Sequence, residues 1–128
     1  MNFDRKYLIW ALAYAVAGMC LGLYMAASQN HGQLVAHAHI LLIGFAVSFV
    51  YAIIHRLWLA KTGKTVARVQ FTLHQAATFV VSLGLMLLYG GVLPDSTVGP
   101  IIGIAAAGVL AGVLLMLYMV VKSQPTPA

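Results

Sequence analysis

The sequence predicts an all-α integral membrane protein built as a bundle of four membrane-spanning helices. Of its 128 residues, 62% are hydrophobic and only 7% are charged, whereas a soluble domain carries roughly 25% charged residues. Four apolar stretches are each long enough to cross a bilayer, which takes about 20 helical residues. The loops between them are too short to hold a second domain, so residues 1–128 are expected to form one domain.

The expected spans cover residues 7–27, 34–58, 69–89 and 99–121. The first is expected to be a true helix, because its apolar core of about 20 residues exceeds the 7–15 usual for a cleaved signal peptide. It holds the only cysteine, Cys20, which excludes a disulfide framework and a CxxC site. The fourth span has no ionisable side chain and is expected to serve packing. GxxxG patterns in the first and fourth spans (GMCLG and GVLAG) favour close contact between these two spans or between copies of the chain.

Charge gives the orientation. All seven basic residues fall on one side of a four-pass topology: Arg5, Lys6, Arg56, Lys61, Lys64, Arg68 and Lys122. By the positive-inside rule, both termini and the middle loop are expected to be cytoplasmic, in a bacterial inner membrane. The net charge of +5 is then a topology signal, because no clustered basic face points to nucleic acid. No acidic residue lies inside a span, so carboxylate-based proton pumping or acid–base catalysis is not expected.

Two histidines, His37 and His39, lie inside the second span in the run LVAHAHILLIGF. An imidazole is costly to bury without a partner. At about 100° per residue, His39 points about 200° away from His37, so the two cannot face one ligand in a straight helix. The residues expected on the same stripe as His37 are small or polar: Gly44, Ser48, Tyr51 and His55.

Depth separates the histidines into two levels. His37 and His39 lie near the outer end of the second span, and His55 lies near its cytoplasmic end. Folding the hairpin about the middle loop places His74 of the third span within roughly a turn of His55. The same fold places Met86 level with His39. Histidines near both surfaces are the coarse layout of a membrane protein that holds haem between its helices.

Haem is the cofactor that suits these features best. A low-spin haem takes axial ligands from two sides, as His/His or His/Met, and Gly44 and Ser48 would make room for the macrocycle edge. Copper is the main competitor, since it accepts imidazole and thioether ligands. The residues that would hold it lie near the outer surface: His31, His37, His39 and Met25. As a further alternative, the histidines only pack, in an accessory subunit without a cofactor.

The stretch HAHILLIGFAVSFVYAIIHRLWL resembles the second transmembrane helix of the catalytic subunits of haem-copper oxidases and nitric oxide reductases. It is especially similar to short four-span relatives with an H-x-H-x-x-L-x-G pattern. RVQFTLHQAATFVVSLGLMLLYGG resembles the third helix of those relatives. The resemblance implies that His37 is the ligand of a low-spin haem, with His39 as second choice. The late helices that carry the opposite ligand and the copper histidines are absent, so His74, Met86 or another copy would supply the second axial ligand.

The sequence therefore predicts a homo-oligomeric membrane protein that binds b-type haem for electron transfer or for redox or gas sensing. Catalytic turnover is not expected, because the ligands of a haem-copper centre are missing. Membrane lipid, a respiratory-chain complex or a redox protein are the expected partners. Two alternatives stay open: a factor that handles copper or haem during oxidase assembly, and a structural or accessory membrane subunit.

Overall fold

The computed structural model describes residues 1–123 and is all-helical over that range. The first rod is α1 (Phe3–Ser28), and the second is divided into α2 (Leu34–His39), the π-helical η1 (Ile40–Ala46) and α3 (Val47–Leu57). The last two rods are α4 (Lys64–Tyr89) and α5 (Asp95–Lys122). All four rods are long and apolar enough to cross a membrane. Each of the four predicted spans thus coincides with one rod, and these four candidate membrane-spanning helices indicate a multi-pass membrane protein.

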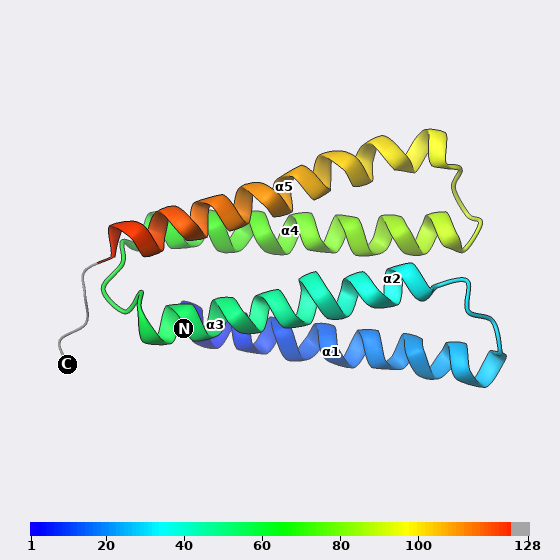
Figure 1. Cartoon of the computed structure of the whole chain (residues 1–128), viewed down its shortest axis with the longest axis horizontal. Coiled ribbons are helices and arrows are strands. Elements are labelled where there is room, and N and C mark those ends of the chain that lie inside the picture. The colour runs from blue at the N-terminus through cyan, green and yellow to red at the C-terminus, as the bar shows by residue number, and fades with distance from the viewer. Residues whose placement is uncertain (124–128) are drawn as a thin grey trace.

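The rods run in alternate directions, so that the start of α1 and the end of α5 lie at one end of the bundle (Figure 1). We call this the basic end, because all seven Lys and Arg side chains belong to helix ends or loops there. The opposite end, the far end, holds the loops 29–33 and 90–94. This arrangement agrees with the predicted four-pass topology, in which all the basic residues lie on one side.

The interior of the bundle widens toward the basic end. The backbone of α4 lies close to α2 and η1, but no Cα atoms of α3 and α4 come within 8 Å of each other. The backbone of α5 approaches α4 alone, and that of α1 lies mainly along the second rod. Large aromatic and polar side chains fill the wedge between α3 and α4. The candidate functional residues lie in this wedge.

The π-helical turn changes which side of the second rod faces inward. A π turn closes its hydrogen bonds five residues back, as the Val47 amide does to the Leu42 carbonyl, and so winds less per residue than an α-helix. The inward residues therefore recur every four positions: Ala36, Ile40, Gly44 and Ser48. The straight-helix prediction was right to place Gly44, Ser48, Tyr51 and His55 on one stripe but wrong to include His37, because Ala36 takes the inward position.

The GxxxG glycines contact neighbouring helices of the same chain. A Cβ on Gly18 would lie 2.5 Å from Leu41, and one on Gly22 would lie 2.9 Å from His37, both in the second rod. On α5, Gly108 lies against Ala77 of α4. These patterns therefore serve contacts of α1 with the second rod and of α5 with α4, rather than a contact between α1 and α5.

Candidate functional site

A group of polar side chains is buried between α1, α3 and α4, and we call it the polar centre. Four of its members recur every four residues on α4, which places them on one face of that helix. All nine members are less than a tenth exposed. They are Tyr7, Ser48, Tyr51, His55, Gln70, His74, Gln75, Thr78 and Ser82. In a bilayer, where water cannot reach exposed polar groups, such a cluster marks a functional site by default.

The rings of the polar centre contact one another around Tyr7. The Tyr7 ring centroid lies 5.6 Å from that of His55 and 6.1 Å from that of His74. Tyr51 lies 5.3 Å from Tyr7 and 5.0 Å from His74 by the same measure. His55 and His74 are thus close together, as the hairpin prediction required. They are separated by a tyrosine ring, which fills the space between the two imidazoles.

Hydrogen bonds connect this cluster to α5. The Tyr7 hydroxyl donates to the Gln70 side-chain carbonyl, and the Gln70 amide donates to the carbonyl of Gly112 at 3.1 Å. Gly112 also lies against His74, since a Cβ there would stand 3.7 Å from the His74 Cβ. The fourth span, predicted to be packing material, therefore also supplies a backbone acceptor to the polar centre.

His74 is the innermost imidazole and is fully buried. Its Nε2 lies 3.2 Å from the Ser48 hydroxyl, which also accepts a hydrogen bond from the Gln75 amide at 3.5 Å. The Nδ1 atom has no hydrogen-bond partner among the described residues, and the backbone of Ile43 lies close to the imidazole. Ile43 lies within the π-helical turn, so the change in winding brings main-chain polar atoms to the imidazole.

Six buried polar atoms of this centre have no hydrogen-bond partner: Tyr51 Oη, His55 Nε2, His74 Nδ1, Gln75 Oε1, Thr78 Oγ1 and Ser82 Oγ. Buried polar groups are nearly always paired with protein or with ordered water. A run of unpaired groups along one path is therefore where water or a polar solute would bind.

The polar centre borders a cavity at the basic end and an apolar cluster toward the far end. At the basic end, a cavity of about 590 Å³ includes His55 in its wall, and we call it the vestibule. Toward the far end, an apolar cluster built on Ala36, Val81 and Leu85 closes the interior. Polar side chains thus extend from the vestibule to the middle of the bundle and stop there.

His37 and His39 lie apart from the polar centre, near the far end. His37 Nδ1 lies 2.8 Å from the carbonyl of Gly18 on α1, and His39 Nδ1 lies 2.8 Å from the carbonyl of Val35 one turn earlier. Because a carbonyl only accepts hydrogen bonds, both Nδ1 atoms must carry the proton. Each Nε2 then has a free lone pair, on side chains that are half-buried.

The positions predicted to hold a cofactor are not brought together in one chain. His37 lies eleven residues from Ser48, the partner of His74, which is about 16 Å along a helix. The Tyr14 ring fills the space beside Gly44, since a Cβ added to Gly44 would lie 2.6 Å from the Tyr14 Cγ. Met86 lies beside Gln33, whose side-chain amide donates to the Met86 carbonyl at 3.0 Å. Gln33 precedes His39 by six residues, so Met86 lies about 9 Å closer to the far end than His39, and not level with it as predicted.

The copper alternative rests on residues with different surroundings. His31 is exposed in the far-end loop and Met25 is buried at the end of α1. Within residues 1–123, no three His, Cys, Asp or Glu side chains gather closely enough to hold a metal ion.

Several members of the polar centre were not predicted from the sequence, among them Tyr7, Gln70, Gln75, Thr78 and Ser82. A signal for four residues was available, because Gln70, His74, Thr78 and Ser82 recur every four positions in a predicted span. Tyr7 carried no such signal, as a tyrosine at the start of a span is ordinary at a membrane interface.

Comparison with models of known families, with curated proteins and with solved structures gives no match.

Proposed function

We propose that the chain takes up protons from the basic end into the polar centre, as the proton-handling subunit of a bacterial inner-membrane complex. The observation that carries this proposal is the run of unpartnered buried atoms between His55 in the vestibule wall and His74 in the middle of the bundle. Histidine is the one side chain that ordinarily changes charge between pH 5 and 8. Chains of ionisable side chains, histidine among them, relay protons inside membrane pumps and transporters.

The arrangement gives each residue a role. His55 exchanges protons with water in the vestibule, and the tyrosine hydroxyls and bound water bridge from it toward His74. Ser48 holds the inner imidazole: if its hydroxyl donates to His74 Nε2, the proton of the ring is on Nδ1, beside the Ile43 backbone. The apolar closure at the far end keeps the path from crossing the membrane, so a partner must accept or supply the proton.

The test measures exchange of the His74 ring proton. Full-length chain labelled with ¹⁵N-histidine is placed in liposomes and transferred to D₂O, and the ring N–H signal is followed by solid-state NMR. We expect His74 to exchange within minutes although it is fully buried, and to exchange at least tenfold more slowly in His55→Phe. His31→Phe, which alters an exposed loop histidine, should leave the rate unchanged. A His74 ring that keeps its proton for hours is a packed core residue, and this result would refute the proposal.

A second candidate function is binding of a b-type haem between two copies of the chain, for electron transfer or redox or gas sensing. The observation that favours it is the His37 hydrogen bond to Gly18, because a ligating histidine usually donates its other ring N–H to a carbonyl or carboxylate. His37 would be one axial ligand and His39 a further contact. His74 lies too far toward the middle of the bundle, and Met86 too far toward the far end, to reach a haem bound at His37. The opposite axial ligand would therefore come from the second copy.

An absorption spectrum of the detergent-purified protein, oxidised and then reduced with dithionite, tests this candidate. A sharp reduced α-band that is lost in His37→Ala and kept in His74→Ala is the expected result. Protein without a Soret band, even when haem is supplied during expression, would exclude it. Colourless protein that takes up Cu(I) only when His37 and His39 are present would favour the copper alternative.

A further inference from the structure

We propose that the vestibule at the basic end binds a phosphate-bearing anion. Its wall contains two buried polar atoms without a partner: His55 Nε2 and the Thr62 hydroxyl oxygen. His55 is only 6% exposed. Neither atom is explained by packing, since an unpaired buried polar group destabilises the fold.

Three cations that form no ion pair within residues 1–123 line the same cavity. Lys6, Lys64 and Arg68 all line the vestibule. The Lys6 ammonium is held over the Phe3 ring, 4.7 Å from its centroid, which fixes the charge at the cavity. A group that presents several acceptor oxygens and negative charge matches this set of donors, and phosphate is the biological group with that chemistry.

The acidic residue in the wall does not cancel this charge. Asp4 accepts a hydrogen bond from the Arg5 amide at 2.7 Å and forms an ion pair with Arg56 at 3.3 Å. Its single negative charge is shared between Arg56 and His55, so the vestibule wall still holds more cations than carboxylates. In addition, α1 and α4 both begin at this end without a side-chain cap, so the positive ends of two helix dipoles lie near the cavity.

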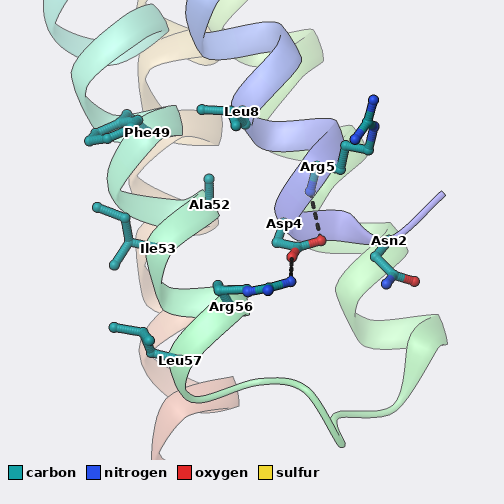
Figure 2. A pocket seen from close by; sticks show the side chains of 9 residues that line it. All are labelled: Asn2, Asp4, Arg5, Leu8, Phe49, Ala52, Ile53, Arg56 and Leu57. Carbon is teal, nitrogen blue, oxygen red and sulfur yellow. Dashed lines mark hydrogen bonds and ion pairs between the residues drawn. The ribbon is translucent and has the colours of Figure 1, made fainter.

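The neighbouring groove indicates that the phosphate belongs to a lipid. On the other side of the Asp4–Arg56 pair, a groove of about 640 Å³ runs between α1 and α3 (Figure 2). Leu8, Phe49 and Ile53 form its apolar part, along the membrane-spanning segments. Because the inner leaflet is rich in anionic lipid, a phospholipid could place its phosphate in the vestibule and an acyl chain in the groove.

Binding to the full-length chain in a neutral detergent tests the inference. Short-chain phosphatidylglycerol, short-chain phosphatidylcholine and inorganic phosphate are titrated separately, with native mass spectrometry and calorimetry as readouts. We expect one phosphatidylglycerol per chain, with affinity reduced roughly tenfold or more in Lys64→Gln/Arg68→Gln, since two charge-assisted contacts are lost. Thr62→Val, which keeps the charge and shape, should weaken binding severalfold.

The matched control is Lys61→Gln/Lys122→Gln, which removes two charges from the same end but outside the vestibule wall. Equal loss in both double variants would show a general electrostatic attraction and overturn the site, as would equal affinity for phosphatidylcholine. Phosphate that binds with the same variant pattern, without preference for lipid, would support the site with a soluble ligand. None of these variants changes the polar centre beyond the vestibule, so this test and the exchange test fail independently.

Discussion

Gly44→Ala tests how the π-helical turn of the second rod is held in place. A Cβ added to Gly44 would lie 2.6, 2.7 and 3.0 Å from Cγ, Cδ1 and Cβ of Tyr14 on α1. Carbon atoms in contact prefer about 3.5–4.0 Å. Rotation of the Tyr14 ring cannot relieve the clash, because one of the atoms is the Tyr14 Cβ itself. The two rods must therefore separate by roughly 0.5–1 Å, and overpacking of this kind costs about 1–3 kcal/mol.

The assay is reversible unfolding in mixed micelles with increasing denaturing detergent, followed by circular dichroism. Gly103→Ala is the matched control, because Gly103 lies inside α5 with nothing within 4 Å of an added Cβ. There, the substitution should stabilise the helix by about 0.5–1 kcal/mol. In a Tyr14→Ala background, Gly44→Ala should destabilise much less, because the two closest ring atoms are gone and only the Cβ contact at 3.0 Å remains.

Two results would refute this reasoning. Gly44→Ala that behaves like Gly103→Ala would show that Gly44 is not in contact with Tyr14. If Gly44→Ala left stability unchanged but shifted a haem absorption band, the glycine would face a macrocycle, as the sequence suggested, rather than a tyrosine. The experiment thus separates a packing role for Gly44 from a cofactor role.

Three further predictions concern other contacts. Tyr7→Phe should destabilise the fold by about 0.6–1.7 kcal/mol, the range of interhelical hydrogen bonds in membranes, and a double-mutant cycle with Gln70→Leu should recover most of this as coupling. Arg56→Gln should change stability by less than about 1 kcal/mol at moderate salt, because the arginine side chain is 77% exposed; a larger loss would show a buried role. With the native cysteine removed, Lys61→Cys should react with an impermeant maleimide only from the cytoplasmic side and His31→Cys only from the other, whereas the reverse pattern would invert the topology.

The number of long apolar helices could be predicted because hydropathy acts locally, although three of them begin four or five residues before the predicted spans. An apolar run of about 20 residues has no alternative to a helix in lipid, where every backbone group must be paired internally. The closeness of His55 and His74 was also predictable, since both are fixed by their distance from a short loop. The Tyr7–Gln70 bond was not, because it joins residues 63 apart whose meeting depends on how α1 and α4 pack.

The π-helical turn shows why the orientation of His37 was predicted incorrectly. Nothing in the apolar run ILLIGFA marks a change of winding. The turn depends on contacts with other helices, such as the fit of Gly44 against Tyr14. A change of winding in the middle of a helix rotates every residue before it relative to every residue after it. The predicted common face of the second rod was therefore correct from His55 back to Gly44 and wrong at His37.

The inner half of the polar centre gives the sharpest reason to assign it a function. Thr78 and Ser82 are buried on the face of α4 with hydroxyls that have no partner, and valine or alanine would fill nearly the same volume without that penalty. Thr78→Val/Ser82→Ala should therefore raise stability by about 1–3 kcal/mol, the usual cost of an unsatisfied buried group. If protons reach His74 from the basic end, the same variant should leave exchange of the His74 ring proton unchanged, because both hydroxyls lie one and two turns beyond His74 on α4. Slower exchange would show that the path to His74 runs through this inner half, and lower stability would show that both hydroxyls are already paired, with protein or with bound water.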